Sequence, residues 1–376
     1  MARVINFNNI PVLITGDHPV IDLILKELSP FPSTNKSAEI KFNITLSEIH
    51  PERGSLNLGS GIYATKDSLY IDLSKDFYYY IKISKDQNSW RWNIDISCTT
   101  TGIPNNPFGR FFEFLHKIKD WTYLTEIEKM AYHIINGVFE PFILFLTRGE
   151  RTFLHASSIV KDNDAVLISG RGGTGKTSTC VELVCESGWK FLSDDISLIG
   201  VDGIAYLYPR YIMMYAYNVE ENKKLFYKLM EKRSFIDRLQ WEFKKRRNGL
   251  KGVRRRVPAE VIFGRDKIGN RGRISKVIHL IRCNSNSFIL RETNARALAV
   301  MNTGIIMEEY YYYLKYMTAW QSSGYSPVTI GEIIKRNQNI FTRAFKNADC
   351  FIVFVPQKTT PKILANFIKD NILTDL

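Results

Sequence analysis

The sequence has few cysteines and none of the spacings that form a zinc site or a disulfide framework. The number of cysteines is odd, and no Cys-x-x-Cys occurs among them: Cys98, Cys180, Cys185, Cys283 and Cys350. Scattered cysteines of this kind are typical of reduced thiols. We therefore expect neither a structural metal nor a disulfide scaffold.

Long apolar runs are also missing. No stretch approaches the about eighteen apolar residues that a transmembrane helix needs. Asn and Pro interrupt the apolar start of the chain, so we expect no signal peptide. Repeats and low-complexity segments are absent as well. These absences predict a globular, cytoplasmic protein with no transmembrane segment.

The chain has 376 residues, which is too long for one ordinary core. Its composition, 45% apolar and 13% aromatic, is that of a globular protein. We expect a β-rich α+β domain over residues 1–125 and a second domain over 126–376. In the first, the stretch from Ile40 to Leu46 alternates with period two, as a half-buried strand does. Similar short stretches follow it, so we expect an antiparallel meander.

The strongest motif follows a short apolar stretch, Ala165 to Ile168, which predicts a buried strand. The next residues fit G-x-x-x-x-G-K-[ST], and the stretch from Ser178 to Ser187, which lacks Gly and Pro, predicts a helix. Strand, Gly-rich loop and helix together indicate a phosphate-binding loop, although a surface turn is the ordinary alternative. Backbone N–H groups and the positive end of the helix would bind phosphate oxygens. We therefore assign nucleotide binding to Gly170, Arg171, Gly172, Gly173, Thr174, Gly175, Lys176, Thr177 and Ser178.

Within such a loop, Lys176 would reach the β- and γ-phosphates and Thr177 would ligate Mg²⁺. The next predicted strand delivers Asp194 and Asp195, and the ends of parallel strands open on the same edge of a sheet. One carboxylate could hold Mg²⁺ and the other could accept the proton of an attacking hydroxyl. By position we expect Asp194 to be the base and Asp195 the metal ligand, with the reverse assignment open and a solvated turn as the alternative.

The order of these motifs resembles the HPr kinase/phosphorylase superfamily. Leu154-His155-Ala156-Ser157 precedes the loop strand, as the family's His-containing strand does, and we expect one strand from Arg151 to Ile159. Tyr208-Pro209-Arg210 follows the Asp-Asp strand, as in the smaller HPr-kinase-related proteins. The resemblance implies an α/β P-loop kinase core of the HPr kinase C-terminal type within residues 126–376. It also implies ATP and Mg²⁺ as ligands, with His155 near the phosphoryl-transfer centre. No Glu-Ile-Arg-Gly-like stretch occurs, so the resemblance is to HPr-kinase-related proteins and does not imply HPr as the substrate.

The positive charge is concentrated in one segment. Residues 222–282 hold twenty Lys and Arg against five Asp and Glu, a net of +15, whereas the remainder holds 31 against 33. We expect this segment to be a basic insertion that binds a polyanion. The alternatives are binding to an anionic membrane surface, binding to the phosphates of nucleotide and substrate, and a solvated face. The residues assigned to binding an anionic acceptor are Arg210, Lys244, Lys245, Arg246, Arg247, Arg254, Arg255 and Arg256.

The sequence therefore predicts an ATP- and Mg²⁺-dependent kinase that transfers the γ-phosphoryl group to a hydroxyl. The acceptor could be a protein or peptide serine, a phosphorylated small molecule or a ribose of RNA. The alternative function is a nucleotide-binding or NTP-hydrolysing module that binds nucleic acid through its basic segment. A homo-oligomer is left open.

Overall fold

The structure is a computed structural model that describes residues 2–7, 10–74, 79–85, 91–98, 106–146, 149–186, 188–220 and 222–376. The chain forms two compact units, Met1–Gly149 with Tyr310–Ile334, and Glu150–Glu309 with Lys335–Leu376. This division differs from the expected boundary after residue 125. The helices that follow residue 125 complete the core of the first unit, where Phe139 stacks on Phe42 with ring centroids 4.0 Å apart.

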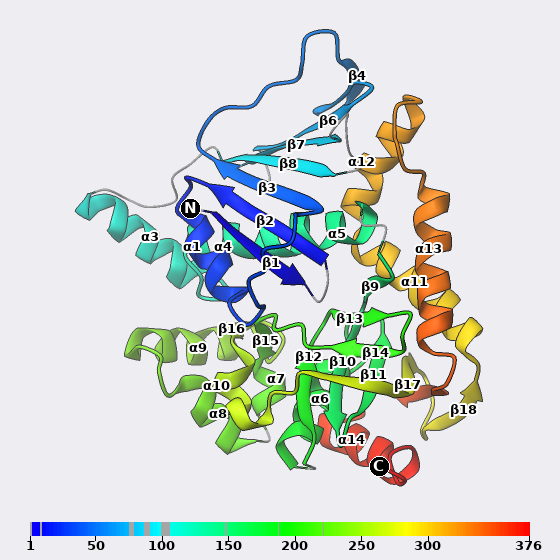
Figure 1. Cartoon of the computed structure of the whole chain (residues 1–376). Helices are drawn as coiled ribbons and strands as arrows, with labels where there is room; N and C mark the ends of the chain where they lie inside the picture. The colour runs from blue at the N-terminus through cyan, green and yellow to red at the C-terminus, as the bar shows by residue number, and fades with distance from the viewer. Residues whose placement is uncertain are drawn as a thin grey trace. The chain divides into compact units, whose positions relative to one another are not determined.

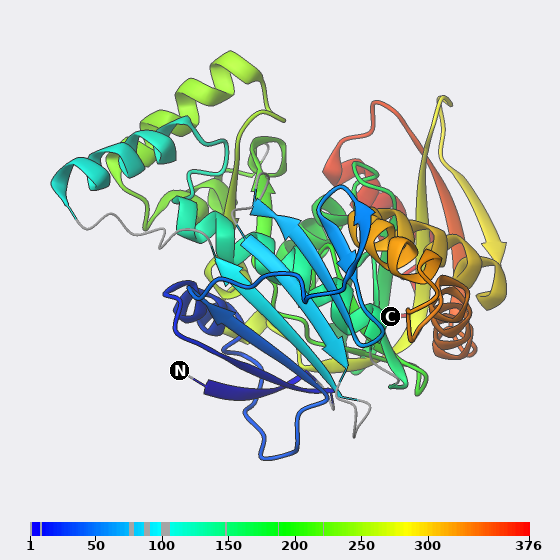
Figure 2. The same cartoon turned by 90° about the horizontal axis from the view of Figure 1, so that it is seen from above.

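The first unit contains an eight-stranded sheet in the order β1-β2-β3-β8-β7-β6-β5-β4, whose strands lie side by side in Figure 2. The strands are β1 (Ala2–Phe7), β2 (Ile10–Gly16), β3 (Ile40–Thr45), β4 (Leu56–Gly59), β5 (Ile62–Ala64), β6 (Ser68–Leu73), β7 (Tyr79–Lys85) and β8 (Trp92–Cys98). The expected antiparallel meander is present only from β8 to β4. β3 runs parallel to both β2 and β8. The first of these pairs is parallel because α1 (Val20–Glu27) carries the chain across the sheet between β2 and β3.

The helices of the first unit come from two segments of the chain, Met1–Gly149 and Tyr310–Ile334. Trp320 of the second segment packs edge-on against Trp92 at 6.4 Å. The other helical elements are α3 (Pro107–Lys119), α4 (Glu126–Ile134), the π-helical turn η1 (Ile135–Phe139), α5 (Glu140–Leu146) and α12 (Tyr311–Ser322).

The second unit contains a nine-stranded sheet, in which β12-β10-β11-β17-β14-β13-β9 are neighbours and β19 pairs with both β17 and β18 (Figure 1). The strands are β9 (Arg151–Leu154), β10 (Ala156–Lys161), β11 (Asp164–Gly170), β12 (Lys190–Ser193), β13 (Ser197–Gly200), β14 (Ile204–Tyr206), β17 (Arg271–Cys283), β18 (Ile289–Thr293) and β19 (Asp349–Pro356). The strands β11, β17 and β19 are parallel. β10 lies between β11 and β12 and is antiparallel to both, so β11 and β12 point the same way without being neighbours.

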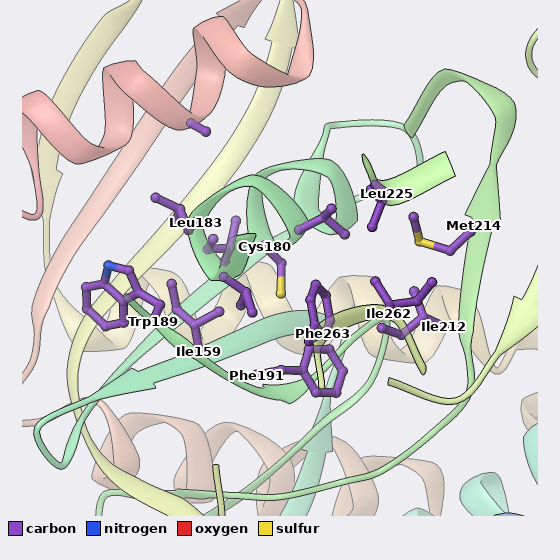
Figure 3. Packing of buried hydrophobic residues seen from close by; sticks show 14 of the residues in the cluster. Ile159, Cys180, Leu183, Trp189, Phe191, Ile212, Met214, Leu225, Ile262 and Phe263 are labelled. Atoms are coloured by element: carbon purple, nitrogen blue, oxygen red, sulfur yellow. The ribbon is translucent and has the colours of Figure 1, made fainter. Parts of the chain in front are cut away.

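The expected strand–loop–helix is present as β11, a glycine loop (residues 171–175) and α6 (Lys176–Glu186). Ser187, the last residue of the expected helix, lies outside the described residues. Figure 3 shows Cys180 and Leu183 of α6 packed among apolar side chains that include Ile159 and Phe191 of the sheet. The remaining elements are β15 (Ile212–Tyr215), β16 (Arg254–Val257), α7 (Ala216–Val219), α8 (Lys223–Met230), α9 (Phe235–Asn248), α10 (Ala259–Phe263), the 3-10 turn η2 (Arg265–Lys267), α11 (Ala295–Glu309), α13 (Ile330–Ala344) and α14 (Pro361–Asn371).

The basic segment 222–282 is not an insertion over its whole length. Its last residues form β17, a strand inside the sheet, and Val253 and Ile262 belong to the hydrophobic core. Arg255 is fully buried, because its guanidinium pairs with Asp237 over 2.7 Å. Part of the positive charge of this segment is therefore internal.

Candidate functional site

The glycine loop turns sharply between β11 and α6. Gly170 has a φ of +137°, and a Cβ at this position would lie 2.5 Å from the carbonyl oxygen of Leu280. Only glycine fits such a close approach of two backbones. Thr174 Oγ1 donates to the carbonyl of Arg171 over 2.8 Å and closes the loop on itself. Within the described part of the chain, the N–H groups from Gly172 to Thr177 have no hydrogen-bond acceptor. The loop therefore presents a set of unused donors.

Lys176 is held inside this loop. Its side chain is 6% exposed, and Nζ donates to the carbonyls of Gly170 at 2.8 Å and Arg171 at 3.1 Å. Burial lowers the pKa of the Lys176 ammonium, and the carboxylates of Asp195, Asp194 and Glu309 act in the opposite direction. A buried cation beside unused N–H groups is suited to bind an anion such as a phosphate.

Asp194 lies directly beside the first turn of α6. Its Oδ2 accepts a hydrogen bond from Thr177 Oγ1 at 3.0 Å, and its Oδ1 accepts one from Ser157 Oγ of β10. Asp194 is 4% exposed. Burial and then the neighbouring Asp195 raise its pKa, and the two hydroxyls and Lys176 counteract this only in part. The residue expected to be the base is thus the carboxylate in contact with Thr177.

Asp195 points to the other side of the cluster, and its backbone φ of +67° is in the left-handed region. Its Oδ2 pairs with Arg210 Nη1 at 3.1 Å, and its Oδ1 lies 3.6 Å from His155 Nε2. The side chain is 46% exposed. Burial raises the pKa of this carboxyl, but Arg210, His155 and Lys176 outweigh burial, so the pKa is lowered below its ordinary value. The pair therefore consists of a buried carboxyl beside the loop and an ionised, accessible one beside Arg210.

His155 lies where the expected strand 151–159 breaks into two. β9 pairs with β13, and β10 pairs with β11 and β12, so the chain changes partners at this residue. The imidazole is 3% exposed and lies between two carboxylates, with Nδ1 3.1 Å from Glu309 Oε2 on the far side from Asp195. Among the described residues, neither ring nitrogen makes a hydrogen bond of ordinary geometry. His155 thus links the end of α11 to the Asp pair.

A groove of about 900 Å³ opens beside the glycine loop. It lies between the loop, β17 and α11 and reaches Glu309, so it adjoins the cluster of His155 and Asp195. The lining combines charged and apolar side chains: Arg171, Gly172, Thr174, His279, Leu280, Ile281, Arg282, Met301, Ile305, Glu308 and Glu309. Its size is in the range of small-molecule sites.

The predicted site residues separate into two groups. The residues from Gly170 to Ser178 meet His155, Asp194, Asp195 and Arg210 in one cluster, where Ser178 Oγ accepts from Asn218 Nδ2 at 2.7 Å. The four basic residues Lys244, Lys245, Arg246 and Arg247 instead lie on α9, which Figure 1 shows beyond α7 and α8 from α6. Lys245 lies 3.6 Å from both Glu220 and Glu242.

The three arginines of β16 are bound within the fold. Arg254, Arg255 and Arg256 lie over the rings of Tyr215, Trp241 and Tyr211, at 5.3, 5.2 and 5.1 Å. Arg255 is fully buried, so it cannot contact an acceptor, and its assignment to acceptor binding was wrong.

Three residues of the cluster were not predicted: Ser157, Glu309 and His279. Ser157 is two residues from His155 in the sequence, and this closeness is a signal that could have found it. His279 Nδ1 lies 3.0 Å from Ser169 Oγ below the loop. Burial and then Lys176 lower its pKa to about 4, and a side-chain hydrogen bond with Asn302 acts in the opposite direction. Glu309 has no local signal, because it is distant in sequence from every other member of the cluster.

Comparisons with known proteins give little further information. No family model matches the chain, and no curated protein gives a significant match to its sequence. Among solved structures, the chain is similar to the HPr(Ser) kinase/phosphatase from Coxiella burnetii, at 12% identity and a TM-score of 0.28. The alignment covers 60% of this chain and 98% of that chain. A TM-score of this size does not establish a common fold. None of the helices that the structure describes is both long and apolar enough to cross a membrane.

Proposed function

We propose that the second unit binds ATP with Mg²⁺ and transfers the terminal phosphoryl group to a hydroxyl of an acceptor. One observation carries this proposal. The hydroxyl of Thr177 and the carboxylate of Asp194 meet at 3.0 Å immediately after a glycine loop with a buried lysine. Nucleoside triphosphatases with such a loop hold Mg²⁺ through a hydroxyl of the loop and a nearby carboxylate.

In this proposal, the glycine loop binds the phosphates of ATP. The unused N–H groups from Gly172 to Thr177 and the start of α6 provide donors and a positive dipole end. Lys176 Nζ, now bound to two loop carbonyls, would exchange these for phosphate oxygens. Because Lys176 and Asp194 are buried, charge stabilisation beside them is stronger than in water.

The donor set fits Mg²⁺. Thr177 and Asp194 offer oxygen ligands, which this ion prefers, and it usually completes its shell with waters and substrate phosphates. Among the described residues, no group of three or more His, Cys, Asp or Glu could hold a metal by itself. When bound, Mg²⁺ would neutralise charge on the phosphates.

In this proposal, Asp195 is the base that faces the acceptor hydroxyl and Asp194 is the metal ligand, which reverses the roles expected from the sequence. Asp195 is ionised at neutral pH and half accessible, whereas Asp194 is occupied by Thr177 and Ser157. Asp195 would accept the proton of the attacking hydroxyl. Arg210 and His155 fix the orientation of its two oxygens.

The acceptor remains within the classes predicted from the sequence, namely a serine of a protein or peptide, a phosphorylated small molecule, or a ribose of RNA. Arg171 and Arg282 line the groove together with Glu308, Glu309 and the apolar Met301 and Ile305, and Arg171 pairs with Glu308, so Arg282 is the cation of the lining that supports an anionic acceptor. A ligand with a charged and an apolar part would match this lining.

The proposal is tested with ATP labelled at the γ position, a cell extract, and two variants. Wild type and Lys190→Ala, an exposed lysine of β12, should both place label in an acceptor, whereas Lys176→Ala should not. Unchanged transfer by folded Lys176→Ala would contradict the proposal. Release of free phosphate alone, stimulated by added RNA, would favour the hydrolysing module that binds nucleic acid.

A further inference from the structure

Helix α9 is attached to the second unit by one narrow face. Asp237, Gln240 and Trp241 are the buried residues of this helix. The carboxylate of Asp237 binds the buried Arg255, and Gln240 accepts from the same guanidinium at 2.5 Å. These polar contacts and Trp241 hold the helix against the second unit.

The outward face of α9 is apolar. Phe235, Leu239 and Phe243 are 73%, 54% and 61% exposed, and their spacing of four residues aligns them in one stripe. Ile236 of the same helix and Tyr227 of α8 are also exposed. An ordinary surface helix turns such residues toward its own core. Figures 1 and 2 show α9 at the outer end of its group of helices within the second unit.

Positive charge surrounds this stripe. Between residues 223 and 251, two acidic side chains are exposed, Glu231 and Glu242, and the carboxylate of Glu242 lies 3.6 Å from Lys245. The exposed basic side chains of the same stretch are Lys223, Lys224, Lys228, Lys232, Arg238, Arg246, Arg247 and Lys251. Arg246 and Arg247 continue the helix directly beyond Phe243. The surface therefore combines three turns of apolar side chains with a basic border.

We propose that α9 docks the protein on the surface of an anionic lipid bilayer. The stripe of Phe235, Leu239 and Phe243 enters the boundary between headgroups and acyl chains, and the basic side chains bind lipid phosphates and carboxylates. Since no described helix can span a membrane, the contact is peripheral. This inference does not depend on the phosphotransfer reaction.

Two other occupants fit the surface less well. Single-stranded RNA stacks its bases on aromatic rings, but Leu239 and Ile236, which lie among the aromatic residues, have no π face to offer. A symmetric contact between two copies would bring the same basic border against itself, and like charges repel. An anionic bilayer complements both the apolar stripe and the charge.

The test measures flotation of the full-length protein with vesicles of phosphatidylcholine alone or mixed with phosphatidylserine. Wild type should bind the mixed vesicles, less at high salt, and should not bind the neutral ones. Phe235→Ser/Leu239→Ser/Phe243→Ser should lose binding, and Arg246→Gln/Arg247→Gln should weaken it by roughly tenfold. The matched control is Ile289→Ser/Leu290→Ser/Ile363→Ser, which removes three exposed apolar side chains elsewhere in the second unit and should bind like wild type.

Near-ultraviolet circular dichroism, to which the buried Trp241 of α9 contributes, verifies that each variant is folded. If the triple variant of α9 unfolds, Leu239→Glu replaces it and should also lose binding. The proposal is overturned if wild type fails to float with the mixed vesicles, or if folded α9 variants float as well as wild type. It is equally overturned if the α9 substitutions abolish binding to a single-stranded RNA or dissociate a dimer while vesicle binding is unchanged.

Discussion

The hydroxyl of Thr177 donates a hydrogen bond to Oδ2 of Asp194 across 3.0 Å, which joins the start of α6 to the end of β12. This contact distinguishes the two carboxylates of the pair. Asp194→Asn should raise the Mg²⁺ concentration needed for half-maximal transfer. Asp195→Asn should lower turnover by about two to four decades with nucleotide affinity near normal, because it removes the base. Titration of each variant with Mg²⁺ and with nucleotide makes the comparison. The opposite pattern would restore the assignment expected from the sequence.

Glu309 is predicted to position His155. Its carboxylate lies 3.1 Å from Nδ1, so Glu309→Gln should release the imidazole, loosen the orientation of Asp195 and lower kcat. The neighbouring Glu308→Gln is the control, since Glu308 pairs with the exposed Arg171 instead. Measurements of kcat and KM for the three proteins give the effect. An unchanged kcat in Glu309→Gln would show that His155 does not need this carboxylate.

Gly170 and Gly172 should respond differently to alanine. A Cβ at Gly170 would meet the Leu280 carbonyl at 2.5 Å, whereas a Cβ at Gly172 would meet no atom within 4 Å. Gly170→Ala should therefore reduce the free energy of unfolding by about 1–3 kcal/mol. Gly172→Ala should leave the stability unchanged and weaken nucleotide binding, because its methyl group occupies the open side of the loop. Urea unfolding without nucleotide and calorimetric titration with nucleotide separate these effects, and equal stabilities would contradict the prediction.

His279 should make the stability depend on pH. Its folded-state pKa of about 4 lies below the ordinary value of 6.5, so the unfolded chain binds a proton more readily. Neutral His279 contributes at most about 3 kcal/mol to the free energy of unfolding. This contribution is fully present above the ordinary pKa and is lost as the pH falls toward about 4. His279→Gln should lose less stability than wild type between about pH 7 and about pH 4. The exposed His50→Gln should behave like wild type, and parallel curves for all three proteins would contradict the role of His279.

The parts of the site that follow one another along the chain could be predicted from the sequence. The glycine loop, the two aspartates and Arg210 belong to adjacent elements, and the pattern of strand, loop and helix brings such residues to one edge of a sheet. The order of the strands could not be predicted. β10 is buried on both faces and contains no signal of direction, so its position between β11 and β12 depends on pairings with distant strands.

Long-range electrostatic contacts were equally invisible. Arg255 occurs in a run of basic residues, which is typical of a solvated surface, and it is buried only because Asp237 is there to compensate it. Glu309 contacts His155 although more than 150 residues separate them in the sequence, and a local sequence pattern cannot predict such a contact. In the first unit, by contrast, a helix between two strands, α1 between β2 and β3, is a pattern that predicts a parallel pair.

The return of the chain to the first unit has a consequence for its synthesis on the ribosome. Glu309, which contacts His155, is followed directly by Tyr310, whose hydroxyl donates to Glu140 of the first unit at 3.1 Å. Trp320, which packs against Trp92, emerges only after most of the second unit has been translated. The first unit therefore cannot close its core in order along the chain, and Trp92 remains without this partner until late in translation. For this protein, a nascent chain halted before residue 310 should be a substrate for chaperones and proteases, although it already contains the entire glycine loop.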